Sequence, residues 1–280
     1  MRNACVSGSF YSGSPQSLRR QIEECFKHEF GPGSIPTVNK DGPRRIVGLM
    51  SPHAGYMYSG PVAAYAYHRL ALDGLIEVAV ILGPNHTGLG SGVAMMEEGV
   101  WRTPLGDVEI DTGLARQIRR VCGIIDIDES SHIYEHSIEV QLPFLQYLYG
   151  SSFKIVPICF MMQDLETCRD VGESLAESLN DRNAVVIAST DLTHYEPQRV
   201  AYGKDMKALN AALKLDEELF YSIIQENRVS ACGYGPVTAM IRSVKRMGAG
   251  KAELLAYKTS GDITGDTSAV VGYASMVFER

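Results

Sequence analysis

The sequence has no long apolar run and no block of basic residues. No stretch of the 280 residues approaches 18 consecutive apolar positions, and the segment from Met1 to Phe10 lacks the apolar region of a secretion signal. Lys and Arg occur singly or in pairs such as Arg44-Arg45, and the net charge is −7. A protein with this negative net charge is repelled by the negatively charged backbone of nucleic acid. We therefore expect a soluble, cytoplasmic protein that binds neither a membrane nor nucleic acid.

Cysteine pairs and common cofactor motifs are also missing. The six cysteines form no CxxC and no short pairing pattern, and an apolar fraction of 45% supplies a full core without disulfides. We find no GxGxxG, no GxxxxGK[ST], no HExxH and no GxSxG. Nucleotide cofactors and serine hydrolase chemistry therefore have no support.

Three apolar, β-branched runs each end in a short polar segment that contains a histidine. The runs cover residues 46–50, 78–82 and 184–188, and they are followed by His53, His86 and His194. Short runs that are apolar on both faces are typical of strands buried in a parallel sheet. In open α/β sheets, ligand sites lie beyond the carboxyl ends of such strands. The pattern predicts either a metal site or an acid–base cluster at that edge.

Helical and extended patterns alternate along the chain without a long linker or an internal repeat. We predict one domain over residues 1–280, of the α/β class, with a mostly parallel central sheet flanked by helices. The first predicted helix begins at Pro15, with Ser14 as its cap. Further helices are predicted at 61–70, 111–121, 135–149 with a break at Pro143, 164–179 and most of 199–248. Further strands are predicted at 153–160, 251–259 and 268–278, with a hairpin within 92–110.

Two histidines and a cysteine are the first candidates for metal ligands. His53 and His86 follow two consecutive strands of the chain, and neighbouring strands lie only about 5 Å apart. Cys232 stands just before a helical pattern. A thiol at a helix N-terminus has a depressed pKa and is a good soft ligand. A histidine bonded only to loop backbone is the structural alternative for His53.

Four more residues are candidates for supporting roles. Asp191 and His194 share one loop and suit a proton-transfer pair, although Asp191 equally suits a turn cap. His136 and Glu139 stand three apart and are expected to share a helical face behind the ligands. Acidic residues near a helix start also favour the helix dipole, which is their structural alternative.

Segments spread over nearly the whole chain resemble the Memo family, whose proteins are similar in fold to the class III extradiol ring-cleavage dioxygenases, the LigB-like group. The segments, in order, are Gly8-Ser9-Phe10-Tyr11, Pro52-His53-Ala54-Gly55-Tyr56, Leu82-Gly83-Pro84-Asn85-His86, Trp101-Arg102-Thr103-Pro104-Leu105-Gly106, Glu135-His136-Ser137-Ile138-Glu139, Ser189-Thr190-Asp191-Leu192-Thr193-His194 and Cys232-Gly233.

The resemblance implies a LigB-like dioxygenase fold and a metal held by His53, His86 and Cys232. Iron(II) or copper(I) is expected, with zinc as a further candidate, and His194 takes the place of the dioxygenase acid/base histidine beside Asp191. We also expect Tyr56 to support the ligands. The resemblance further implies a radical-SAM protein and a third small protein family as partners, besides a small-molecule substrate.

The sequence departs from the dioxygenases at the third ligand, and this leaves several functions open. Those enzymes hold iron(II) with two histidines and a carboxylate, whereas Cys232 stands here. Some Memo proteins also carry a histidine where this chain has Gly235. The leading hypothesis is an iron- or copper-dependent redox enzyme. The alternatives are a non-catalytic metal- or partner-binding scaffold, and a metal-free enzyme with Cys232 as nucleophile and His194 as base.

Overall fold

Four parallel strands form the centre of the sheet in the computed structural model, which describes residues 1–280. Their spatial order is β1 (Ile46–Ser51), β8 (Ala184–Ser189), β2 (Val78–Pro84) and β7 (Lys154–Phe160). Every side chain of β1, β2 and β8 is buried, which explains why these strands are apolar on both faces. The predicted buried strands are thereby confirmed.

Additional strands extend the sheet on both sides of this centre. The long strand β11 pairs antiparallel with β1 and with β10, and β9 pairs with the start of β11. On the other side β3 pairs antiparallel with β7 and parallel with β6, while β4 and β5 form a separate hairpin. The bounds are β3 Val93–Met95, β4 Val100–Thr103, β5 Gly106–Glu109, β6 Asp126–Ile127, β9 His194–Glu196, β10 Lys251–Thr259 and β11 Val270–Glu279.

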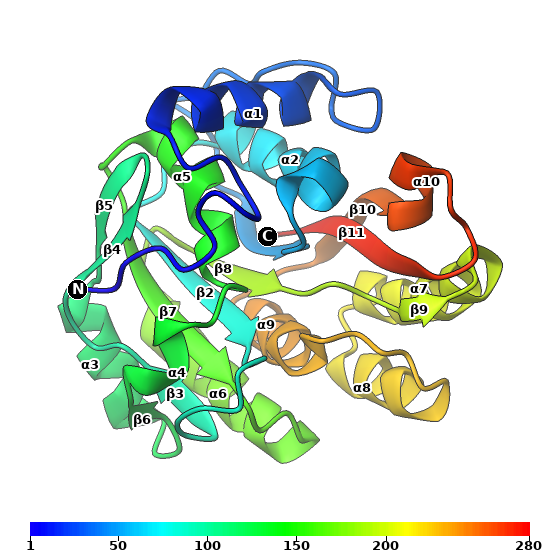
Figure 1. The fold of residues 1–280 in the computed structure, drawn as a ribbon. Helices are drawn as coiled ribbons and strands as arrows, with labels where there is room; N and C mark the ends of the chain where they lie inside the picture. Colours follow the sequence, from blue (N-terminus) through cyan, green and yellow to red (C-terminus); the bar gives the residue numbers. More distant parts are fainter.

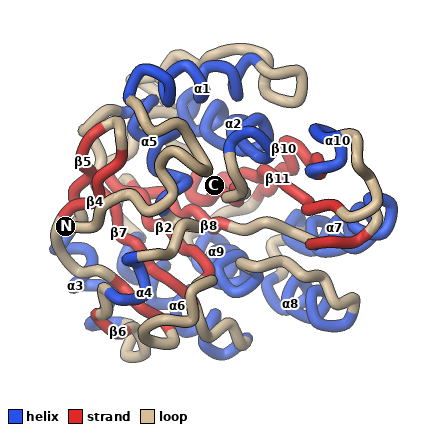
Figure 2. The backbone as a smooth tube through the Cα atoms, in the orientation of Figure 1, coloured by secondary structure: helices blue, strands red, loops and turns tan.

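Helices cover both faces of the sheet (Figures 1 and 2). On one face lie α1 (Pro15–Lys27), α2 (Tyr56–Asp73) and α5 (Leu142–Tyr149), which contact one another. On the other face lie α3 (Thr112–Val121), α6 (Leu165–Leu179), α8 (Glu217–Glu226) and α9 (Tyr234–Arg246). Helix α7 (Gln198–Leu213) packs against β10 and β11. Three short helices complete the fold, namely α4 (Ser130–Ile133), the 3₁₀ helix η1 (Glu139–Gln141) and α10 (Ser260–Thr264). The predicted single α/β domain with a mostly parallel centre is the observed architecture, consistent with the Memo and LigB-like fold.

Two predicted helices differ from the observed ones, and proline is the reason in both cases. Helix α2 begins at Tyr56 and not at Pro61, which lies inside the helix; a proline there removes one backbone hydrogen bond without ending the helix. The segment 135–149 is broken, as expected, but the break comes before Pro143 and not at it. Pro143 lies in the first turn of α5, where proline is favoured, and Glu139 lies in η1. His136 precedes both, so the predicted helical face shared with Glu139 is wrong.

The strands before His53 and His86 are consecutive in the chain but are not neighbours in the sheet, so the spacing of one strand pair does not apply to these two histidines. Strand β8 lies between β1 and β2 and pairs parallel with each. The three strands still end at the same edge, because all three run in one direction. The residues that follow β1, β8 and β2 are therefore brought together across two strand spacings.

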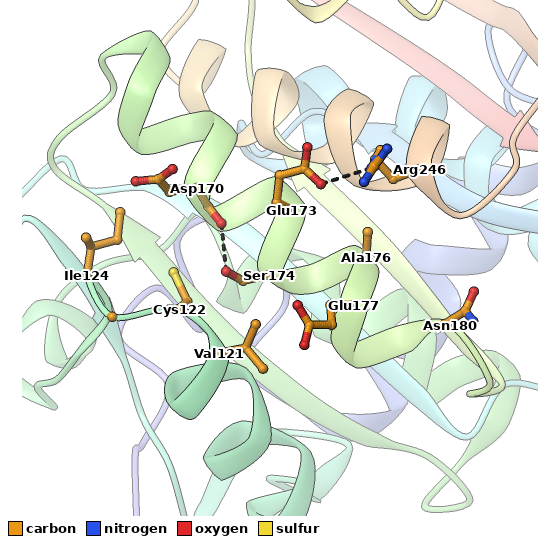
Figure 3. Close-up of a pocket in the computed structure, with 11 residues that line it drawn as sticks. Val121, Cys122, Ile124, Asp170, Glu173, Ser174, Ala176, Glu177, Asn180 and Arg246 are labelled. Carbon is orange, nitrogen blue, oxygen red and sulfur yellow. Dashed lines mark hydrogen bonds and ion pairs between the residues drawn. The ribbon is translucent and has the colours of Figure 1, made fainter.

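A surface groove on the face covered by α3, α6, α8 and α9 lies away from that edge. It has a volume of about 610 Å³ and lies between the end of α3 and the side of α6, with Arg246 of α9 at its rim (Figure 3). None of the candidate site residues lines this groove.

No helix of the structure combines the length and the apolar character needed to cross a bilayer.

Candidate metal centre

Three side chains from distant parts of the chain meet beyond the carboxyl ends of the central strands. His53 follows β1, His86 follows β2, and Cys232 stands before Gly233, the N-cap of α9. One ligand atom from each lies within 4.8 Å of the other two, with Cys232 Sγ 3.2 Å from His53 Nε2. The imidazole centroids of His53 and His86 are 5.2 Å apart. The predicted convergence of these three residues is confirmed.

A buried carboxylate holds the ring of His86 from behind. Glu135 Oε1 lies 2.9 Å from His86 Nδ1, and it also accepts the backbone N–H groups of His136 and Ser137 at 2.8 Å each. Burial alone would raise the pKa of Glu135, but the contacts with His86 outweigh it and lower the pKa to about 2. The ionised carboxylate only accepts, so His86 donates from Nδ1 and keeps the lone pair on Nε2 for a metal.

His53 is almost fully buried, with 2% of its surface exposed. Its backbone N–H donates to Asp191 Oδ1 at 2.9 Å, and its Nδ1 lies 2.9 Å from the hydroxyl oxygen of Ser189. Burial, followed by the proximity of His136 and His86, lowers the pKa of His53 well below its ordinary value. The ring is neutral at pH 7, which is the form that binds metals.

The predicted depression of the Cys232 pKa is wrong. Desolvation raises the pKa of this thiol, and the nearby Asp191 carboxylate raises it further. Although the residue retains some surface exposure, its sulfur is packed against Asp191, whose N–H lies 3.3 Å away, and against the hydroxyl of Thr190. The N-terminus of α9 does not compensate for this burial. A bound cation would favour the thiolate here.

Asp191 and His194 lie beside the cluster without joining it. Burial raises the pKa of Asp191 to about 6, and its carboxylate is engaged by the backbone of His53. His194, on β9, accepts nothing from the cluster; its backbone N–H donates to Ser230 Oγ at 2.7 Å, and its Nδ1 lies 2.9 Å from the Ser230 carbonyl. A carbonyl only accepts, so Nδ1 carries the proton and Nε2 is free.

Of the three other predicted supporting residues, one reaches the site and two do not. The ring of His136 stacks on that of His86 at 4.7 Å and meets the His53 ring edge-on at 5.4 Å. The buried hydroxyl of Tyr56, the first residue of α2, donates to the Val140 carbonyl at 2.7 Å. Glu139 forms an ion pair with the buried Arg2. Tyr56 and Glu139 therefore form no hydrogen bond and no ring–ring pair with the three candidate ligands.

Four residues that hydrogen-bond to the candidate ligands or to their direct partners were not among the predicted site residues. They are Glu135, Ser189, Thr190 and Gln141. Three of them belong to the segments that carry the family resemblance, so their sequence position contained a signal. Gln141 had none, because it lies in η1 and reaches the site only through Pro52 and Ser189.

The fold and these side chains define an α/β protein with a two-histidine, one-cysteine cluster at the carboxyl edge of a mostly parallel sheet. The sequence profile of the family described as "Memo-like protein" matches residues 2–277. The MEMO1 family protein of Methanopyrus kandleri is 56% identical over 282 aligned positions, covering 100% of this chain and 99% of that protein. Those of Methanothermobacter thermautotrophicus and Sulfolobus acidocaldarius are 51% and 49% identical, each with 99% of both chains covered. The chain belongs to the Memo family.

Proposed function

We propose that this chain binds a transition-metal ion through His53 Nε2, His86 Nε2 and Cys232 Sγ. The observation that carries the proposal is the convergence of three donor atoms, from three distant segments, within 4.8 Å. Metal bonds of about 2.0–2.3 Å to nitrogen and sulfur are compatible with such a cluster after small side-chain movements. The donor chemistry fits as well, since imidazole and thiolate together favour iron, copper or zinc over magnesium or calcium. Iron(II) and copper(I) are our first candidates.

We further propose that the metal serves an oxidoreductase reaction on a small molecule. When bound, an iron or copper ion supplies Lewis acidity and electron transfer at this position. Replacement of the carboxylate of the dioxygenase triad by Cys232 argues for redox chemistry other than ring cleavage. The protein partners implied by the family resemblance, a radical-SAM protein and a third small protein, stay predictions.

The residues of the chain itself suit proton handling next to such an ion. The Ser230 carbonyl leaves His194 with a free lone pair on Nε2, so we assign the proton transfer to this atom. Asp191 holds the backbone of His53 and bears a carboxylate close enough to His194 that a protonated imidazole there lowers its pKa. We therefore assign Asp191 to orientation of the loop and stabilisation of a protonated His194.

The metal-free alternative has less support. A nucleophilic cysteine requires a thiolate at neutral pH, and burial raises the pKa of Cys232. No hydrogen bond joins its sulfur to His194, the base that this alternative needs; the contacts of the sulfur are with His53, Thr190 and Asp191.

Anaerobic purification followed by elemental analysis tests the proposal directly. We expect about one iron or copper per chain, retained through gel filtration and lost in a variant with both His53→Ala and His86→Ala. Oxygen uptake with a panel of catechols and other reduced small molecules then tests turnover. Metal without turnover would favour the scaffold alternative. A metal-free wild type with a rapidly alkylated Cys232 would instead favour the cysteine nucleophile.

A further inference from the structure

A chain of buried hydrogen bonds approaches His53 from the side opposite the cluster. It runs from Tyr67 on α2 through Gln141 on η1 to Ser189 at the end of β8, and from there to His53 Nδ1. Ser189 is 0% and Gln141 1% exposed. We propose that Ser189 is a positioning residue that fixes the tautomer of His53. The inference rests on the proposed function, because it explains how one metal-facing nitrogen is made available.

The proton of the Ser189 hydroxyl is already committed to another partner. Its oxygen lies 2.7 Å from the carbonyl oxygen of Ser137, which can only accept, so the single hydroxyl proton points there. The same oxygen lies 2.8 Å from the amide nitrogen of Gln141, which donates to it. The remaining lone pair faces His53 Nδ1 at 2.9 Å. Ser189 therefore accepts from His53, and Nδ1 must carry the proton.

The orientation of the Gln141 amide is fixed by the carbonyl group of Pro52. Its Nε2 lies 3.0 Å from the carbonyl oxygen of Pro52, which would repel an amide oxygen. Its Oε1 lies 2.5 Å from the Tyr67 hydroxyl, which donates to it. A flipped amide would place its oxygen against the Pro52 carbonyl oxygen and lose that hydrogen bond, so the amide nitrogen is the group that donates to Ser189. Each group in the chain then has one consistent role.

The consequence for His53 is a lone pair on the nitrogen that faces the cluster. A neutral imidazole with its proton on Nδ1 has a free Nε2, and this atom lies 3.2 Å from Cys232 Sγ. His86 reaches the same state through Glu135. The two rings thus use different acceptors, a hydroxyl and a carboxylate, to present the same nitrogen. Only the hydroxyl needs neighbours that direct its proton away from the imidazole.

The test measures the tautomer in metal-free protein and therefore does not depend on metal binding. Protein with ¹⁵N-labelled histidine is examined at pH 8 by long-range ¹H–¹⁵N correlation spectra, in which the two neutral tautomers give different patterns. A His53→Gln variant assigns the signals. We expect wild-type His53 to be entirely the Nδ1–H form. A wild-type spectrum of the Nε2–H form would overturn the proposal without any further variant.

Ser189→Ala removes the acceptor, and Ser275→Ala is the matched control. Ser275 is a fully buried serine of β11 whose hydroxyl has no hydrogen-bond partner, so its loss removes the same atom elsewhere in the sheet. We expect Ser189→Ala to give a mixture of tautomers or the Nε2–H form, and Ser275→Ala to keep the wild-type pattern. If Ser189→Ala does not fold, Ser189→Cys retains the shape with a much weaker acceptor and has the same expected result. An unchanged His53 pattern in the folded variant would overturn the positioning role.

Anaerobic copper(I) titration of the same proteins separates this proposal from the proposed function. We expect affinity to fall by about 10- to 100-fold in the folded Ser189 variant and to be unchanged in Ser275→Ala. A wild type that shows the Nδ1–H form but binds no metal would refute the metal site and leave the tautomer assignment intact. A metal-binding Ser189→Ala protein of wild-type affinity would refute the positioning role and leave the metal site intact.

Discussion

The sulfur of Cys232 is the only donor of the cluster that carries a negative charge when it binds a metal. Replacement by Ser supplies a neutral, hard hydroxyl, so we expect copper(I) or iron(II) affinity to fall by at least about 100-fold. Competitive anaerobic titration gives the affinity, and circular dichroism gives the fold. Cys122→Ser is the control, because Cys122 is buried at the end of α3, outside the cluster. Equal affinity in wild type and Cys232→Ser would show that the sulfur is not a ligand.

Glu135 and Glu139 are buried carboxylates with separable roles. Glu135 orients His86, so Glu135→Gln should weaken metal binding by about 10- to 100-fold while the protein stays folded. The measurement is again competitive titration, at a temperature where circular dichroism reports a native protein. Wild-type affinity in Glu135→Gln would contradict the assigned role of this carboxylate.

Glu139→Gln should act on stability and not on metal affinity. Burial alone would raise the pKa of Glu139, but the Arg2 guanidinium and the Cys5 backbone N–H hold it below its ordinary value. The substitution leaves Arg2 buried at 4% exposure without its charge partner, which costs about 3–5 kcal/mol. Urea unfolding measures this loss. A folded Glu139→Gln protein with weakened metal binding would instead restore Glu139 as a supporting residue of the site.

At the scale of elements, the junction before α9 is held against the end of β8 by a close backbone contact. A Cβ added at Gly233 would lie 2.3 Å from the Ser189 carbonyl oxygen. The backbone N–H of Gly233 donates to Thr190 Oγ1 at 2.9 Å. Gly233→Ala must therefore move the segment that carries Cys232. We expect a loss of about 1–3 kcal/mol in unfolding free energy and a drop in metal affinity.

Gly203→Ala is the matched control for that substitution, since a Cβ there meets no atom within 4 Å. This residue lies inside α7, so alanine should leave stability unchanged or raise it by up to about 1 kcal/mol. Denaturant unfolding and copper(I) titration are run on both variants. Wild-type stability and affinity in Gly233→Ala would show that the junction tolerates displacement.

The same scale shows what local patterns predict and what they leave out. Ser14, expected as a helix cap, accepts the backbone N–H of Ser17, and the helices predicted from Asp111 and Asp164 begin one residue later with these two carboxylates as caps. The helix bounds predicted from Pro61 and Pro143 were inaccurate. A proline is tolerated at several positions in the first turns of a helix, so it does not show at which residue the helix begins. Local chemistry thus determines where an element exists better than where it begins.

For the whole molecule, the sequence predicted the edge at which the site forms but not the arrangement behind it. Runs that are apolar on both faces indicated buried parallel strands, and the polar residues after them indicated one shared edge. The insertion of β8 between β1 and β2 depends on long-range pairing, which no local pattern contains. The raised pKa of Cys232 depends on burial by Asp191 and Thr190, and is equally invisible in the sequence.

His132 gives the whole molecule a stability that depends on pH. The residue is 0% exposed, packs edge-on against Trp101, and neither ring nitrogen has a hydrogen-bond partner, although the Ala94 backbone lies near. Burial, aided by the charge of Arg2, lowers its pKa from 6.5 to about 4. Between these two values the unfolded chain binds a proton that the native protein does not. Unfolding free energy is therefore lost as pH falls below 6.5.

Replacement of His132 by Phe removes this titration and an unpaired polar ring. At pH 7.5 we expect the variant to be as stable as wild type or more stable by about 1–2 kcal/mol, since Phe buries no unsatisfied nitrogen. At pH 5 the advantage should grow by about a further 2 kcal/mol, because only the wild type is destabilised by His132 protonation in the unfolded chain. Urea unfolding at the two pH values measures both differences. Groups other than His132 contribute equally to the pH dependence of unfolding free energy in the two proteins. An equal stability difference at both pH values would therefore mean that the native His132 ring has a hydrogen-bond partner or binds a proton, which would contradict the prediction.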